Sequence, residues 1–305
     1  MITTPTVLVL GAGASYPYGF PTAKELKGLI CETFSHREAP ASRLLGDNSD
    51  YSPDEFFGFR EAFLKSGQPS VDAFLERRPN FLGVGKLAIA YCLIPFEDEA
   101  KLYRPDFLRG GDWYEYLSVK LSSSFEEFGN NKLSIITFNY DRSLEQYLLN
   151  SLVNLHGRTF DECAKMLAKI PIIHVYGQLG EHPYPQKGCY EYRSHREQFR
   201  NVARAAAGIT LFYEEAAGGP GAARELLAAA ECICFLGFSY HPLNISRLAI
   251  DTSSIGSKFV VGTAVGLIGK EVVDVEGRVA RAIGSAITLS DADNLVVLRQ
   301  NMLLG

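Results

Sequence analysis

The sequence has no excess of positive charge and no long hydrophobic segment. Its 30 lysine and arginine residues are outnumbered by 35 aspartate and glutamate residues, which gives a formal net charge of -5. A protein that neutralises many nucleic-acid phosphates needs the opposite balance, so direct nucleic-acid binding is not expected. No uninterrupted apolar run approaches the roughly 18 residues of a membrane-spanning helix, so we expect no membrane segment.

Closely spaced cysteine pairs are also missing. The six cysteines are scattered along the chain: Cys31, Cys92, Cys163, Cys189, Cys232 and Cys234. Because no C-x-x-C motif occurs, we expect neither a disulfide framework nor a zinc ribbon, and we expect reduced thiols. The chain enters an apolar segment almost at once, without the basic segment, apolar core and cleavage site of a secretion signal. We therefore expect a cytoplasmic protein.

Five short, nearly continuous apolar segments predict buried parallel strands, because strands covered on both faces lose their polar alternation. The segments are residues 6–10, 133–138, 172–176, 232–237 and 258–263, and residues 286–290 are a candidate sixth strand. Helical patterns lie between them, and two begin with capping boxes, Thr22 with Glu25 and Thr159 with Glu162. This alternation predicts an α/β fold, a Rossmann-like doubly wound parallel sheet with ligands at the carboxyl ends of its strands.

One long segment interrupts the alternation. About a hundred residues between the first helix and the strand at residue 133 have no convincing strand pattern, and this length exceeds any ordinary loop. We predict a large helical insertion over residues 35–130, within a single domain that covers residues 1–305. Residues 265–305 form a C-terminal extension.

A glycine turn follows the first predicted strand, where the sequence reads GAGAS from Gly11 to Ser15. Gly11 and Gly13 permit a tight turn and close approach of a ligand, and the N–H groups of the next turn favour a phosphate. The alternative is a strand-to-helix turn without a ligand. A dehydrogenase fingerprint would place a glycine at Tyr16, and the G-x-x-x-x-G-K-[ST] motif does not occur, so hydride-transfer dehydrogenases and P-loop NTPases are disfavoured.

Polar residues also follow the later strands. Asn139 and Asp141 come after the second strand, at the ligand edge of the sheet; alternatively, Asp141 caps a helix and Asn139 stabilises a turn. His174 lies in or at the end of the third strand, where a hydrogen-bonded core histidine is the alternative to a catalytic base. Gly237 and Ser239 follow the fourth strand and either bind a phosphate or ribose or simply form a turn.

Taken in order, the motifs GAGAS, GFPTA, TFNYD, HVYGQLG and GFSY resemble the sirtuin-like fold. The resemblance is closer to the NAD-consuming sirtuin-like effectors of bacterial antiphage defence, and the HerA-associated type is most similar. It covers roughly residues 7–23, 133–180 and 231–263, and it leaves the helical insertion and the C-terminal extension uncovered.

The resemblance implies an NAD hydrolase that cleaves the bond between nicotinamide and ribose, with NAD as substrate and without zinc. Asn139 is implied to position the ribose or a water molecule. Further contacts with the dinucleotide are implied for the two glycine turns, the segment after the first turn and the aspartate of TFNYD: Gly11, Ala12, Gly13, Ser15, Phe20, Pro21, Thr22, Asp141, Gly237 and Ser239.

The sequence departs from the sirtuin pattern at the catalytic histidine. Sirtuins have a histidine immediately before a glycine, whereas Tyr176 stands at that position here and His174 lies two residues earlier. Residues two apart on a strand face the same side. We therefore predict that His174 reaches the pocket and is catalytic together with Asn139, and Tyr176 is the alternative.

This departure and the missing zinc ribbon leave other functions open. A sirtuin-like module that binds NAD or an ADP-ribose derivative without turnover is the main alternative, and a deacylase or ADP-ribosyltransferase is a third. The resemblance also implies a homo-oligomer and a separate regulatory protein, such as a HerA-type ATPase or an Argonaute-related protein. The insertion and the C-terminal extension are the candidate contact regions.

Overall fold

A computed structural model of the chain describes residues 1–180, 185, 191–193, 195–210, 220–251, 257–301 and 304. A parallel sheet of six strands forms its centre, in the order β3-β2-β1-β4-β5-β6. The strands are β1 Thr6–Leu10, β2 Leu133–Thr137, β3 Ile172–His174, β4 Cys232–Leu236, β5 Phe259–Thr263 and β6 Ile287–Ser290. The predicted Rossmann-like α/β fold is confirmed, and each predicted strand segment contains one of these strands.

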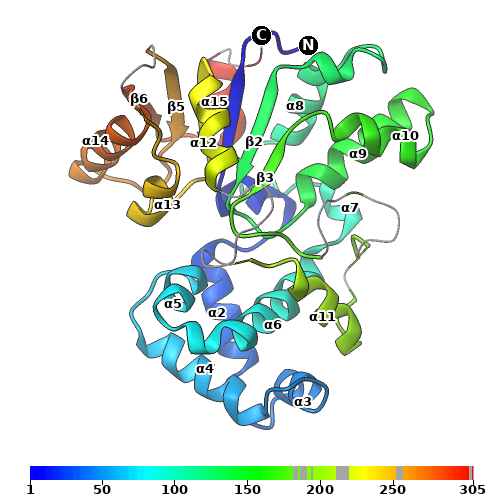
Figure 1. Ribbon diagram of the computed structural model, residues 1–305, viewed down its shortest axis with the longest axis vertical. Helices are drawn as coiled ribbons and strands as arrows, with labels where there is room; N and C mark the ends of the chain where they lie inside the picture. The colour runs from blue at the N-terminus through cyan, green and yellow to red at the C-terminus, as the bar shows by residue number, and fades with distance from the viewer. Residues whose placement is uncertain are drawn as a thin grey trace.

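Helices cover both faces of the sheet, as Figure 1 shows. Alternate strand residues supply the two layers of the core: Val7 and Val9 of β1 pack on one side, and Leu8 and Leu10 on the other. The first face carries α12 Pro220–Ala229, α13 Pro242–Arg247 and α14 Lys270–Ile283. The second face carries α8 Trp113–Leu121, α9 Ser143–His156, α10 Phe160–Leu167 and α15 Asn294–Gln300.

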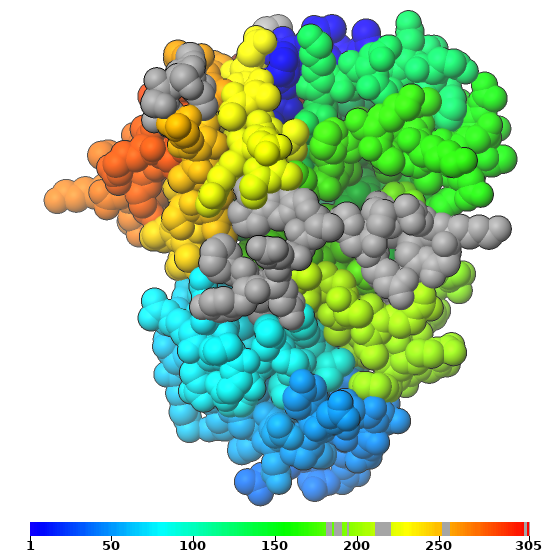
Figure 2. Space-filling model, in the orientation of Figure 1, coloured from blue at the N-terminus to red at the C-terminus, as the bar shows by residue number. Residues whose placement is uncertain are grey.

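A separate helical body lies at the carboxyl ends of the strands (Figure 1). It consists of α2 Ala23–Thr33, α3 Pro40–Gly46, α4 Pro53–Lys65, α5 Val71–Arg77, α6 Leu82–Leu93 and α11 Phe199–Ala207. In the space-filling view these helices make the lower part of the molecule and the sheet layer makes the upper part (Figure 2). The body therefore joins two distant segments of chain, because α11 packs against α6.

Short helical elements complete the connections between these layers. They are α1 Ala12–Ser15, α7 Glu99–Leu102 and the 3-10 helices η1 Tyr16–Tyr18, η2 Pro79–Phe81, η3 Ile94–Phe96 and η4 Phe128–Asn130. Both predicted capping boxes are present, at the N-termini of α2 and α10. Five cysteines are free thiols; the sixth, Cys189, lies outside the described residues.

In the described part of the chain, one helical stretch is apolar enough, by length and composition, to cross a membrane. Residues 79–96 have a mean hydropathy of 1.3 and include α6. Half of this stretch is buried inside the protein, where α6 contacts α2, α4, α5 and α11. A helix that is apolar on all sides and packs against several other helices is typical of a buried core helix.

Candidate functional site

Two glycine turns meet at the point where the strand order reverses, between β1 and β4. In open α/β sheets ligands bind in the crevice beside such a reversal. The Gly11 N–H donates to the Leu236 carbonyl (3.0 Å), and the Gly13 N–H donates to the Gly237 carbonyl (3.0 Å). A Cβ atom on Gly13 would lie 2.7 Å from the Gly237 Cα, and Gly237 has a φ of +56°. Packing of one turn on the other therefore requires these glycines, and both N–H groups are engaged within the protein.

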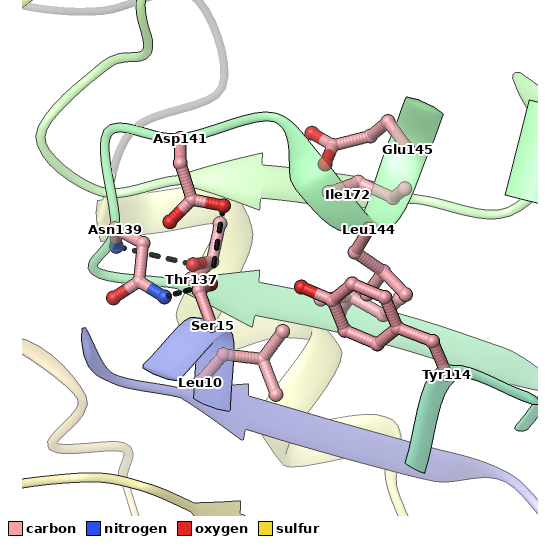
Figure 3. A pocket seen from close by; sticks show the side chains of 10 residues that line it. Leu10, Ser15, Tyr114, Thr137, Asn139, Asp141, Leu144, Glu145 and Ile172 are labelled. Carbon is pink, nitrogen blue, oxygen red and sulfur yellow. Dashed lines mark hydrogen bonds between the residues drawn. The ribbon is translucent and has the colours of Figure 1, made fainter. Parts of the chain in front are cut away.

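Asn139 joins the first turn to the end of β2. Its Nδ2 donates to the Gly11 carbonyl (2.9 Å) and to the Ser15 hydroxyl (3.1 Å). Ser15 in turn donates to Asp141 Oδ1 (3.1 Å). Figure 3 shows the Asn139 Oδ1 directed away from Ser15. Within the described residues no group donates to this oxygen, so it is placed to accept a hydrogen bond from a ligand or a water molecule.

Asp141 also organises the start of α9. The Ser143 N–H donates to Asp141 Oδ1 (3.1 Å), and the Ser143 hydroxyl donates to the same oxygen. The N-cap residue of α9 is Arg142, so Asp141 is not the N-cap, although it satisfies a first-turn N–H. Burial raises the pKa of Asp141, and the hydrogen bonds from Ser143 and Ser15 oppose that shift.

A small cavity with a mixed lining lies beside this network (Figure 3). Its polar lining comes from the first turn, α8, β2, the loop after β2 and α9: Ser15, Tyr114, Thr137, Asn139, Asp141 and Glu145. Leu10, Ile135, Leu144 and Ile172 supply the apolar part. The cavity leaves about 10 Å³ for the centre of a water molecule, which is room for roughly one water. A ribosyl group is far larger, so its binding here requires the surrounding segments to move.

His174 lies directly behind Asn139 and is buried. Its Nδ1 is 2.9 Å from the Asn139 backbone carbonyl, and its Nε2 is 2.6 Å from Glu145 Oε1. A carbonyl oxygen only accepts, so Nδ1 carries a proton. Burial favours the neutral ring, but the charge and hydrogen bond of Glu145 outweigh it and raise the pKa of His174 above its ordinary value. Both ring nitrogens are thus engaged, and His174 holds the backbone of Asn139.

Tyr176 lies in a different environment. Its hydroxyl donates to Asn244 Oδ1 (2.6 Å) and is hydrogen-bonded by Arg247, whose guanidinium is 4.7 Å from the centre of the tyrosine ring. The prediction that His174 and Tyr176 face the same side is wrong. β3 ends at His174 and the chain turns at Gly177, which has a φ of +69°, so the alternation of a strand does not extend to Tyr176.

The remaining predicted residues do not join the Asn139 network. Phe20 is buried, with its ring 6.2 Å from that of Phe96, and Pro21 is buried beside it in the chain. The Thr22 side chain belongs to the capping box of α2. Ala12 is half-buried in α1, and Ser239 is exposed two residues beyond Gly237.

Three residues of the site were not predicted from the sequence. Glu145 comes four residues after Asp141 in the chain. Its place in the sequence does not indicate that its side chain contacts His174. Ser143 follows Asp141 closely in the chain. Tyr114 comes from the helical insertion, and its hydroxyl is 2.6 Å from the Ser143 hydroxyl. The sequence has no signal that brings Tyr114 to this place.

Comparison of the chain with protein-family models and with curated proteins finds no match. The described part of the chain contains no group of three or more histidine, cysteine, aspartate or glutamate residues that could hold a metal ion.

Proposed function

We propose that this chain is an NAD hydrolase that converts NAD and water to nicotinamide and ADP-ribose. The observation that carries the proposal is the meeting of Asn139, Ser15 and Asp141 beside the glycine turn, at the reversal of strand order. An amide and a carboxylate beside such a crevice suit a ribosyl group next to a pyrophosphate. The resemblance of the strand-end motifs to sirtuin-like NAD hydrolases supports the same activity.

Hydrolysis of NAD depends more on the orientation of the substrate and the attacking water than on acid catalysis. In NAD the nicotinamide ring carries a positive charge, and it leaves as a neutral molecule when the C1′–N bond breaks, so its departure needs no added proton. The transition state resembles an oxocarbenium ion. The Asn139 Oδ1 accepts a hydrogen bond from the attacking water and aims its oxygen at C1′. The carboxyl group of Asp141 lies nearby, and its ionised form stabilises the positive charge that develops on the ribosyl group.

The same chemistry explains how the site works without a free imidazole. Water that attacks an oxocarbenium-like centre becomes acidic as the new C–O bond forms, so its proton passes to solvent after the bond-making step. A strong general base is then unnecessary. In this mechanism His174 acts as a positioning residue for Asn139, because Nδ1 holds the Asn139 carbonyl and Nε2 holds Glu145.

A specific observation favours a second candidate function, a module that binds NAD or ADP-ribose without turnover. The residue at the position of the sirtuin histidine is Tyr176, and its hydroxyl is engaged by Asn244 and Arg247. Hydrolysis in sirtuin-like enzymes uses a histidine whose ring nitrogen faces the ribose. A module that only binds the dinucleotide does not need such a histidine.

The resemblance also supports a proposal about the cellular setting. We propose a cytoplasmic antiphage effector that works as a homo-oligomer under the control of a separate protein, such as a HerA-type ATPase. Exposed apolar side chains in both candidate contact regions support such contacts: Phe107 and Leu108 in the insertion, and Val265, Ile268 and Val273 in the C-terminal extension.

Incubation of the purified chain with NAD, alone and with the partner ATPase, tests the activity when products are separated by chromatography. We expect wild type to release nicotinamide and ADP-ribose in equal amounts. Asn139→Ala should lose roughly 100-fold or more in rate. The exposed Asn154 of α9 provides a matched control, because Asn154→Ala leaves the site intact. Binding of NAD without any nicotinamide release would establish the second candidate instead.

A further inference from the structure

A buried ion pair lies immediately beside Asp141. Arg142 and Glu97 are completely enclosed, and Arg142 Nη2 lies 2.8 Å from each oxygen of Glu97. A buried pair of this geometry holds its surroundings in one arrangement, since either charge alone would be costly.

The pair also contacts a distant segment, residues 191–193. Arg142 Nη2 is 3.4 Å from the Glu191 carbonyl, and the Arg193 backbone N–H donates to Glu97. The Arg142 guanidinium also lies 5.9 Å from the centre of the Tyr192 ring. The backbone on both sides of Tyr192 is therefore hydrogen-bonded to the ion pair, and its ring contacts the Arg142 guanidinium.

The hydroxyl of Tyr192 is buried and has no hydrogen-bond partner within the described part of the chain. Burial, and then the negative charges of Glu97 and Asp141, raise the pKa of Tyr192 well above its ordinary value, so the hydroxyl keeps its proton. Asp141 and Tyr114 both line the small cavity. Buried hydroxyl groups are almost always hydrogen-bonded, so an unsatisfied one next to the ion pair that adjoins Asp141 points to a ligand.

We propose that Tyr192 is a ligand-binding residue whose hydroxyl hydrogen-bonds a hydroxyl group of the nicotinamide ribose. This inference rests on the proposed function. A ribose hydroxyl both donates and accepts, so it can donate to Asp141 while it accepts from Tyr192. The Glu97–Arg142 pair is the clamp that keeps Tyr192 over the ribose.

Calorimetric titration of wild type and Tyr192→Phe with ADP-ribose tests the proposal, because ADP-ribose retains this ribose and is not consumed. We expect Tyr192→Phe to bind roughly 3- to 10-fold more weakly and to be at least as heat-stable as wild type without ligand, since the substitution removes an unsatisfied hydroxyl. Tyr18→Phe is the matched control for stability. The Tyr18 hydroxyl accepts from the Tyr114 N–H (2.7 Å) and donates to Asp112 (2.9 Å), so its loss should lower the melting temperature.

The possible outcomes separate this inference from the proposed function. If wild type binds ADP-ribose and Tyr192→Phe binds it equally well, Tyr192 does not contact the ligand. A clear fall in the melting temperature of ligand-free Tyr192→Phe would show that the hydroxyl already has a partner in the protein, which also overturns the inference. If wild type binds neither NAD nor ADP-ribose, the proposed function fails and this inference fails with it.

Discussion

Glu145 Oε1 lies 2.6 Å from His174 Nε2, so the first turn of α9 is tied to the last residue of β3. The other ring nitrogen of His174 holds the backbone carbonyl of Asn139. The buried ion pair of His174 and Glu145 therefore sets the position of Asn139. We assign the side-chain amide of Asn139 to the attacking water. The histidine that first suggested a general base is therefore better explained as a support for Asn139.

Glu145→Gln tests this ion pair through the pH dependence of stability. The folded pKa of His174 is raised above its ordinary value of 6.5, so its stabilisation is complete below about pH 6.5 and is lost as pH rises through the folded pKa. We expect Glu145→Gln to lower the free energy of unfolding by about 3 kcal/mol near pH 6. The difference from wild type should shrink toward pH 9 in urea unfolding. Glu225→Gln, on the exposed side of α12, is the matched control. A loss that does not vary with pH would contradict the ion pair.

Ser15→Ala removes the hydroxyl that links Asn139 to Asp141. We expect kcat to fall roughly 10-fold with little change in KM, because the variant loses orientation and keeps the binding surface. The free energy of unfolding should fall by about 1 kcal/mol. Ser118→Ala is the control. It removes a half-buried hydrogen bond between the Ser118 and Ser151 hydroxyls (2.7 Å), which joins α8 to α9 and does not line the cavity. An equal loss of kcat in both variants would assign the effect to stability alone.

Gly237→Ala tests the packing of the two glycine turns. The new Cβ would lie 2.1 Å from the Ala14 nitrogen, and the residue has a φ of +56°. We expect a loss of about 3 kcal/mol or more in the free energy of unfolding. Gly67→Ala isolates the conformational part of this cost, because Gly67 has a φ of +68° and no atom lies within 4 Å of the place that its new methyl group would take. It should cost about 1 kcal/mol. Equal losses in the two variants would mean that the turns can separate without cost.

Arg142→Met tests the buried clamp beside Asp141. The substitution leaves the Glu97 carboxylate buried without its partner, so we expect a loss of about 3–5 kcal/mol in urea unfolding. The double variant Arg142→Met with Glu97→Leu should recover much of that stability, because neither charge is then buried. A double variant whose loss equals the sum of the two single losses would show that the residues do not interact.

The sequence predicted the sheet well because its strands are local features. Each strand is a short apolar run whose composition reflects burial on both faces, and the capping boxes at Thr22 and Thr159 depend only on residues three apart. The boundary of β3 was less accessible. The predicted segment ran to residue 176, and the turn after His174 depends on contacts with α9 and with the loop that contains Asn139.

By itself, the sequence determined the α/β class, the strand segments and the meeting of Asn139, Asp141 and the glycine turns at one edge of the sheet, because parallel strands all end on the same side. Tertiary structure alone decided which side chains are available there. Whether His174 is a base or a support depends on Glu145, and whether Tyr192 lies near Asp141 depends on an ion pair between residues 45 positions apart. Such long-range contacts arise only when the helices pack on the sheet, so no local pattern in the chain encodes them.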